Sequence, residues 1–103
     1  MSARKITKEI FENEVITSEK IVLLDFYADW CGPCRMVSPI VDQIAEENPQ
    51  YLVCKANVDE EAELAAQFGV MSIPTLVVLK GGQVINQLTG ARPKDDILRA
   101  LEG

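Results

Sequence analysis

The stretch DFYADWCGPCRM, residues 25–36, decides the fold, and within it two cysteines stand two residues apart. It joins an apolar run, KIVLLDFYA at 20–28, to a segment from Cys31 to Asn48 whose apolar residues recur at helical spacing. The run predicts a central strand that is covered on both faces, and the spacing predicts an amphipathic helix. Cys31 and Cys34 are therefore expected at the start of a helix that directly follows a buried strand.

Outside this stretch, strand patterns and helix patterns alternate along the chain. The predicted elements are, in order, a strand at 4–7, a helix at 7–16 with Thr7 as its N-cap, the strand at 20–28, the helix at 31–48, a strand at 51–58, a helix from the cap Asp59 through Phe68, strands at 75–80 and 83–89 joined by Gly81-Gly82, and a last helix that starts at Pro93. Strands that alternate with helices imply parallel pairing, and the hairpin adds antiparallel strands. We expect an α/β fold with a central mixed β-sheet of about five strands flanked by about four helices, in a single domain over residues 1–103.

The composition argues against several kinds of function. The chain of 103 residues has a net charge of −6, and it has no basic stripe that would pair with phosphates, so we expect no nucleic acid partner. No apolar run approaches the ~20 residues that span a membrane. The first ten residues, MSARKITKEI, lack the apolar core of a signal peptide. We therefore expect a cytoplasmic protein with no membrane partner.

The position of the two cysteines at a helix start gives them different chemistry. Unpaired backbone N–H groups and the positive end of the helix dipole stabilise a thiolate, which lowers the pKa of Cys31. Cys34 lies one turn further in, where we expect it to be buried and protonated at rest. Because only a thiolate attacks a disulfide, we expect Cys31 to be the nucleophile and Cys34 to be the resolving cysteine.

A Cys-x-x-Cys pair can also be half of a metal site. A structural zinc site needs four ligands, whereas this chain offers only Cys54 as a third cysteine and has no histidine. Cys54 lies in the middle of a predicted strand, where a buried thiol packs as a small hydrophobic group. We therefore expect no metal, and we expect Cys54 to be an inert core residue.

Asp25 interrupts the apolar run of the central strand. An ionised carboxylate is costly to bury without a partner, and burial raises its pKa toward neutrality. Two roles are open: an ion pair with Lys55 on the neighbouring strand, or acceptance of the proton of Cys34 during the second exchange step. The second role is favoured because Asp25 lies only six residues before Cys31.

Over essentially its whole length the chain resembles the thioredoxin family. The residues Trp30-Cys31-Gly32-Pro33-Cys34 resemble the family's active-site motif in full. The resemblance extends to the acid of DF at 25–26, Pro39 within the helix, KANVD at 55–59, SIPT at 72–75 and Gly90. It implies a thioredoxin fold over 1–103, an active-site loop that contains Trp30, Gly32 and Pro33, and a redox-active disulfide between Cys31 and Cys34.

The resemblance also implies roles for residues outside the motif. Asp25 and Lys55 resemble the family's buried acid and the lysine that supports proton transfer. Ile73-Pro74 looks like the family's cis-proline loop, in which the backbone of Ile73 offers an edge to an extended substrate. The implied substrate-binding surface is shallow and apolar, and it comprises Trp30, Ile73, Pro74, Gly90 and Ala91.

Three positions depart from the family's usual pattern. Tyr27 stands where many members have tryptophan, Arg35 follows the motif where lysine is common, and Met71-Ser72 precede the proline loop. These departures bear on packing and on the choice of partner rather than on the shared chemistry.

The resemblance implies a monomeric reductant of disulfide-containing target proteins. It would need no bound cofactor, and a thioredoxin reductase would restore the dithiol. Because Pro33 stiffens the first turn and removes a donor near the sulfurs, we expect a potential at the reducing end of a scale that runs from about −270 mV for thioredoxin to about −120 mV for strong oxidants. Two alternatives stay open: an oxidase or isomerase that runs the same chemistry in the other direction, and a non-catalytic binding module.

Overall fold

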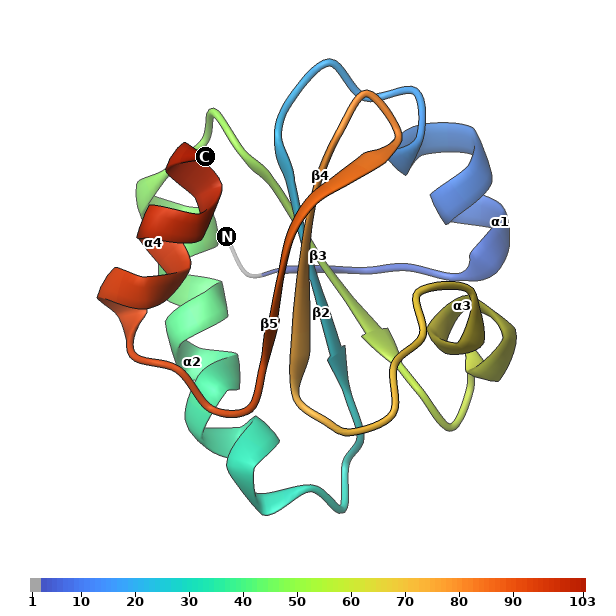
Figure 1. Ribbon diagram of the computed structural model, residues 1–103, viewed down its shortest axis with the longest axis vertical. Helices are drawn as coiled ribbons and strands as arrows, with labels where there is room; N and C mark the ends of the chain where they lie inside the picture. Colours follow the sequence, from blue (N-terminus) through green and yellow to red (C-terminus); the bar gives the residue numbers. More distant parts are fainter. Residues whose placement is uncertain (1–2) are drawn as a thin grey trace.

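The computed structural model of the chain, which describes residues 3–103, contains one five-stranded sheet in the order β1-β3-β2-β4-β5 (Figure 1). The strands are β1 (Arg4–Lys5), β2 (Val22–Tyr27), β3 (Leu52–Asn57), β4 (Thr75–Lys80) and β5 (Gln83–Thr89). β3 runs parallel to both β1 and β2, whereas β4 runs antiparallel to both β2 and β5. The predicted mixed sheet is therefore confirmed, with β2 in its middle.

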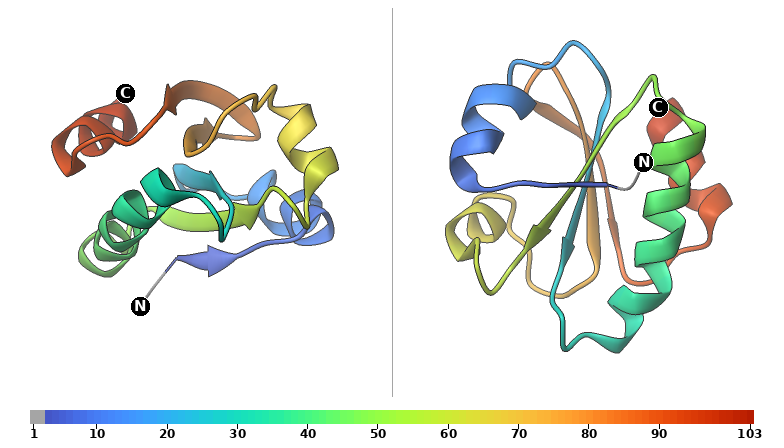
Figure 2. Two further views of the ribbon diagram at one scale, coloured as in Figure 1. Left: turned by 90° about the horizontal axis from the view of Figure 1, so that it is seen from below. Right: turned by 180° about the vertical axis from the view of Figure 1, so that it is seen from behind.

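Helices cover both faces of this sheet. One face carries α1 (Lys8–Ile10), which continues into the π-helical turn η1 (Phe11–Val15), together with α3 (Ala62–Gln67). The other face carries α2 (Gly32–Glu47) and α4 (Lys94–Glu102). The two groups lie on opposite sides of the strands in both views of Figure 2. In the described part of the chain no helix combines the length and the hydropathy that crossing a bilayer requires.

Alternation of side chains along β2 places an apolar core in each layer. On the α1 and α3 face, Leu24 and Phe26 pack with Phe11 and Leu64, all of them fully buried. On the α2 and α4 face, Leu23 packs in a second cluster with residues of both helices. Asp25 also points to the α2 face, because it follows Leu24 and alternates with it. A strand that is apolar on both faces thus carries one acid, on the side of the helix that begins at the cysteines.

The N-cap residues predicted from the sequence are right for α1 and wrong for α3. Thr7 caps α1 as predicted, since its hydroxyl oxygen accepts the N–H of Ile10 at 3.2 Å. The prediction that Asp59 caps the next helix is wrong, because α3 begins at Ala62. The side chain of Asn57 accepts the N–H of Asp59 at 2.9 Å and forms a turn before the helix begins. This turn keeps Asp59 outside α3.

The last helix and the hairpin follow the predicted pattern closely. α4 begins at Lys94, so Pro93 is its N-cap rather than its first helical residue. Gly81 and Gly82 join β4 to β5 with φ values of 59° and 79°. Positive φ at both central residues is what a type I′ hairpin turn requires, and glycine adopts it without steric cost.

Candidate active site

The two cysteines of the motif form a disulfide across the first turn of α2. Cys31 is the N-cap of this helix, and its Cα atom lies 5.3 Å from that of Cys34. The Sγ atom of Cys31 accepts the backbone N–H of Cys34 at 3.2 Å. Pro33 occupies the first turn, where its missing N–H leaves no hydrogen bond unmade. The predicted position of both sulfurs at a helix N-terminus is therefore confirmed.

Burial does not distinguish the two cysteines. Cys31 is 4% exposed and Cys34 is 3% exposed, so the prediction that Cys34 is buried holds, but it holds for Cys31 as well. The difference lies in the backbone around them. The Sγ atom of Cys31 faces an N–H donor of the helix start and lies 3.8 Å from the carbonyl oxygen of Ile73. In the dithiol, that donor would stabilise negative charge at position 31.

Asp25, on the α2 side of β2, is buried and is only 3% exposed. Its Oδ1 atom accepts no hydrogen bond from any residue in the described range. Burial raises the pKa of Asp25 to about 7; the charge of Lys55 lowers it and the charge of Asp42 raises it. A carboxyl group with this pKa can both lose and accept a proton near neutral pH.

The alternative role of Asp25, an ion pair with Lys55, is not formed. The two residues are partners in the β2–β3 register, yet within residues 3–103 no ion pair of 4.0 Å or less joins them. The ammonium of Lys55 lies instead 5.9 Å from the centre of the Tyr27 ring. Lys55 and Tyr27 line a cavity of about 270 Å³ whose wall also contains Cys34; the remaining lining residues are Ala28, Asp29, Arg35 and Ser38.

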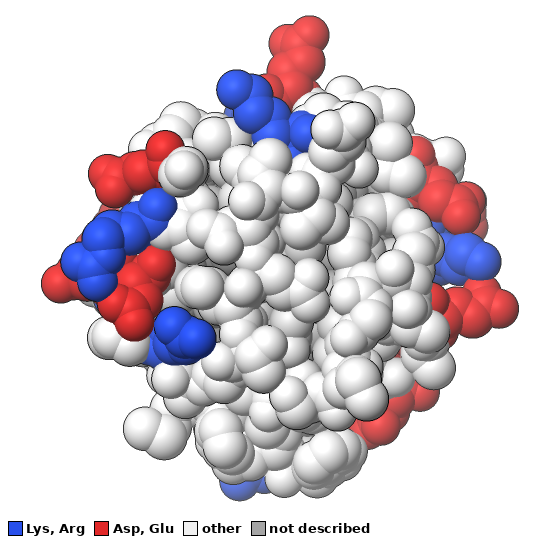
Figure 3. Space-filling view, in the orientation of Figure 1, with Lys and Arg blue, Asp and Glu red and all other residues white. Residues whose placement is uncertain are grey.

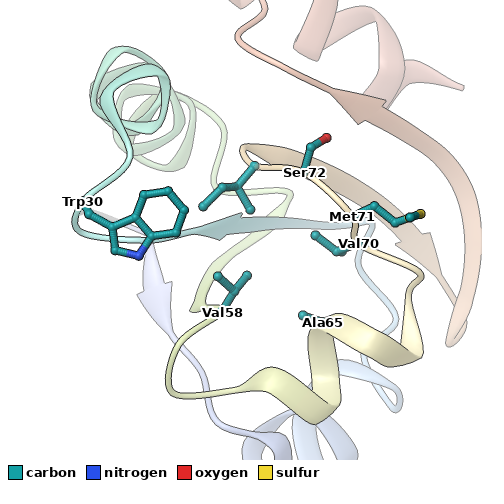
Figure 4. A pocket seen from close by; sticks show the side chains of 7 residues that line it. Trp30, Val58, Ala65, Val70, Met71 and Ser72 are labelled. Carbon is teal, nitrogen blue, oxygen red and sulfur yellow. The ribbon is translucent and has the colours of Figure 1, made fainter.

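An apolar groove lies on the other side of the disulfide loop, between Trp30 and the segment 70–73. It has a volume of about 340 Å³ and is lined by Trp30, Val58, Ala65, Val70, Met71, Ser72 and Ile73. Figure 4 shows Trp30 at one end and Met71 with Ser72 at the other. Trp30 is 68% exposed, and its indole N–H donates to the carboxylate of Asp59 at 2.9 Å. Asp59, predicted as a helix cap, thus holds the indole at the groove.

The implied substrate surface is divided in two by the structure. Ile73-Pro74 is a cis peptide, and the carbonyl oxygen of Pro74 accepts the N–H of Gly90 at 2.8 Å. Trp30 and Ile73 line the groove described above, whereas Ala91 lines a second apolar hollow of about 270 Å³ with Met36, Val37, Ile40, Arg92 and Pro93. The loops that carry these residues meet at the lower end of the molecule in Figure 1.

Few charged side chains appear at the centre of the face that Figure 3 shows. Figure 3 shows them gathered at the two sides and the top of the view, with the centre and the lower end largely uncharged. The groove beside Trp30 is lined almost wholly by apolar side chains, which suits contact with apolar side chains of another protein. Sequence reasoning missed Val58, Ala65 and Val70 as groove residues, because their strand and helix patterns indicate only core packing.

The third cysteine lies apart from this site. Cys54 is a free, buried thiol on β3 in the core cluster of α1 and α3. Burial raises its pKa to about 11, with a smaller lowering by the charge of Arg4. The prediction that Cys54 is a core residue is confirmed, and its inertness stays a prediction.

Comparisons of the sequence and of the structure with known proteins match thioredoxins. The Thioredoxin family model matches residues 2–103. The chain is 46% identical to Thioredoxin 1 of Nostoc sp. over 102 residues, which cover 98% of this chain and 95% of that protein. It is 50% identical to the thioredoxin of Listeria monocytogenes over 95 residues, or 91% of this chain and 90% of that one. A solved mutant thioredoxin from Halobacterium salinarum superposes with a TM-score of 0.90 at 35% identity, covering 98% of this chain and 88% of that one.

Proposed function

The chain belongs to the thioredoxin family and is a thiol–disulfide oxidoreductase, and from this we propose that it is a general reductant of protein disulfides. It would act as a monomeric single domain over 1–103 in the cytoplasm, with a thioredoxin reductase as the source of electrons. The observation that carries the proposal is the disulfide at the start of α2, where the Sγ atom of Cys31 already accepts a helix N–H.

The first chemical step is the attack of the Cys31 thiolate on a target disulfide. A bond forms between Cys31 and one target sulfur, and the other target sulfur leaves as a thiolate that takes a proton from solvent. The N–H of Cys34 supports this step, because a donor aimed at Sγ stabilises the attacking thiolate. The product is a mixed disulfide between the protein and its target.

The second step releases the reduced target. Cys34 loses its proton to Asp25 and attacks the Sγ atom of Cys31; the second target sulfur leaves as a thiolate, and two electrons have passed to the target. Asp25 suits this role because its pKa, raised by burial to about 7, matches the pH at which it must accept a proton. Lys55 supports the transfer by favouring the ionised carboxyl group.

Target docking would use the surface around the disulfide. An extended target segment would lie along the backbone of Ile73 beside Trp30, Pro74, Gly90 and Ala91. Gly32 and Pro33 hold the cysteines in one turn. A bonding edge of main chain next to an apolar groove gives affinity without demanding a particular target sequence.

Insulin-disulfide reduction with dithiothreitol as the electron source tests the proposal. Wild type should accelerate the reaction strongly, and Cys34→Ser should reduce it to nearly the rate of dithiothreitol alone, because the mixed disulfide cannot resolve. Equal rates for wild type and variant would support a non-catalytic binding module.

The direction of the chemistry needs its own measurement. Equilibration with a dithiothreitol or glutathione buffer should give a potential near about −270 mV, whereas a value near about −120 mV would support an oxidase. Recycling assays with NADPH-linked and ferredoxin-linked reductases would then identify the electron donor, and sedimentation would test the monomer.

A further inference from the structure

Tyr27, Lys55 and Asp25 lie together on one face of the sheet. Tyr27 follows Asp25 by two residues on β2, so both side chains point toward α2. Lys55 is the register partner of Asp25 on β3 and shares this face. The Lys55 ammonium lies 5.9 Å from the centre of the Tyr27 ring, which is within the range of a cation–π contact.

The position of Lys55 affects the pKa of Asp25, because the other causes of its shift all raise that pKa. Burial raises the pKa of Asp25 most; the charge of Lys55 on β3 lowers it, and the charge of Asp42 on α2 raises it further. The register partner of Asp25 on β4 is the apolar Leu76. The positive charge of Lys55 therefore opposes the rise in the pKa of Asp25 that burial and the charge of Asp42 cause.

The next cation along the sheet is engaged elsewhere. Lys5 on β1 is the register partner of Lys55, but its ammonium forms an ion pair with Glu60 at 2.9 Å. Burial is the largest cause of the raised pKa of Tyr27; the charge of Lys5 lowers it, and the charges of Asp29, Glu60 and Asp25 raise it. The phenol of Tyr27 thus stays neutral, and its ring face is what Lys55 meets.

We propose that the Tyr27 ring is a positioning residue for Lys55: it holds the ammonium at the cavity beside Cys34, on the face of the sheet that carries Asp25, and keeps it from forming an ion pair with Asp25. This inference rests on the proposed role of Asp25 as proton acceptor. It assigns a task to Tyr27, one of the positions at which this chain departs from the usual family pattern.

The ring is needed because Lys55 has a long, rotamer-rich side chain. Nothing else in the described contacts of Lys55 fixes its ammonium, and a free lysine gains conformational freedom and hydration by turning to solvent. A ring face attracts the cation, whereas an aliphatic side chain of similar size only fills the space. Without the ring, Lys55 should leave the cavity and Asp25 should hold its proton more tightly.

The test measures the protonation of Asp25 directly. Carboxyl ¹³C NMR titration of the oxidised protein, in which Cys31 and Cys34 do not titrate, gives the midpoint of Asp25 in four proteins: wild type, Tyr27→Leu, Tyr27→Phe and Lys55→Met. We expect Tyr27→Leu to raise the midpoint by about half a pH unit. Tyr27→Phe keeps the ring and should leave the midpoint in place, and Lys55→Met should raise it at least as much as Tyr27→Leu.

The double variant separates positioning from simple packing. If Tyr27 acts through Lys55, then Tyr27→Leu should cause no further shift in the Lys55→Met background. A shift of equal size in that background, an unchanged midpoint in Tyr27→Leu, or a downward shift would each overturn the proposal. Tyr27→Met, which also removes the ring, takes the place of Tyr27→Leu if that variant folds poorly.

Kinetics distinguish failure of this inference from failure of the proposed function. Stopped-flow reaction with an aromatic disulfide reagent releases one chromophoric thiolate at the attack and a second when Cys34 resolves. The pH profile of the second release should move upward in Tyr27→Leu with the NMR midpoint. A midpoint that moves while this profile stays fixed would refute Asp25 as proton acceptor and leave the positioning of Lys55 intact.

Discussion

Cys31 at the start of α2 and Cys54 in the middle of β3 are nearly equally buried, at 4% and 1% exposed, yet their surroundings favour opposite behaviour. Cys54 lies in an apolar layer, and its register partner on β2 is Leu24, so burial raises the pKa of its thiol to about 11. Cys31 faces the N–H of Cys34 at a helix N-terminus. The comparison teaches that burial alone does not silence a thiol; the hydrogen-bond donors around the sulfur decide its reactivity.

The largest expected difference between the two regions is in catalysis. Cys31→Ser should reduce insulin reduction to the rate of the chemical reductant alone, because a hydroxyl group does not exchange with disulfides. Cys54→Ala should keep the rate within about twofold and lower the free energy of unfolding by about 1 kcal/mol, since it leaves a small cavity in the core. A large loss of activity in Cys54→Ala, with the fold intact, would break the comparison.

Alkylation compares the thiols within one protein. In the reduced, folded protein at pH 7, iodoacetamide should modify Cys31 on the order of 10³-fold faster than Cys54, because a thiol with a pKa of about 11 is almost wholly protonated there. Peptide mass spectrometry measures the two rates. In denaturant the rates should converge, and Cys34 should react more slowly than Cys31 in the folded state. Equal labelling of Cys31 and Cys34 at mildly acidic pH would contradict their assigned roles.

A pH titration of stability tests the acid that faces the α2 layer. The folded pKa of Asp25, about 7, lies above its ordinary value of 3.8, so the folded state binds the proton more tightly than the unfolded state. Stability associated with this group is therefore present below about pH 4 and is lost as the pH rises through about 7. Asp25→Asn should remove this dependence and make the protein more stable than wild type by a few kcal/mol at pH 8.

Urea unfolding of wild type and Asp25→Asn across this pH range gives the difference between their free energies of unfolding. The contributions of all other carboxyl groups are the same in both proteins and cancel in this difference. The same variant should turn over more slowly, because Cys34 loses its proton acceptor. Wild type and variant curves that stay parallel would mean that Asp25 is ionised when folded.

The smallest expected effect concerns the groove at Trp30, which lies next to Cys31 and has no counterpart around the buried Cys54. Asp59→Ala removes the acceptor of the Trp30 indole N–H. A hydrogen bond in this setting contributes about 1 kcal/mol, so the KM for insulin should rise by about twofold to fivefold. Reduction of a small aromatic disulfide should stay unchanged, since it needs no docking groove. A loss that is equal for both substrates would place the effect on the disulfide itself.

Much of the fold could be predicted because its signals are local. The apolar run before Asp25, the glycine pair at the hairpin and the hydroxyl of Thr7 act within a few residues of themselves, and the elements appear where they indicate. The position of the two cysteines at the helix start was also predicted correctly, since Cys31 and Cys34 lie on one helical turn.

What could not be predicted depends on contacts between distant segments. Asp59 has the sequence signature of a helix cap, but the side chain of Asn57 forms the turn there. The carboxylate of Asp59 instead accepts a hydrogen bond from the indole N–H of Trp30. The groove joins Trp30 to segments near residues 58, 65 and 70–73, which only the folded chain brings together. Tyr27, Val58 and Ile73 pack against the two cysteines, and the last of these is 42 residues further along the chain than Cys31.

The disulfide of this protein joins residues only three positions apart, within a single helical turn. Closing so short a ring removes little freedom from the unfolded chain, about 2 kcal/mol in the chain-entropy picture, compared with about 4.7 kcal/mol for a loop of 100 residues. The disulfide therefore contributes little to the stability of the fold. Forming or breaking it during the redox reaction should change the free energy of unfolding only slightly.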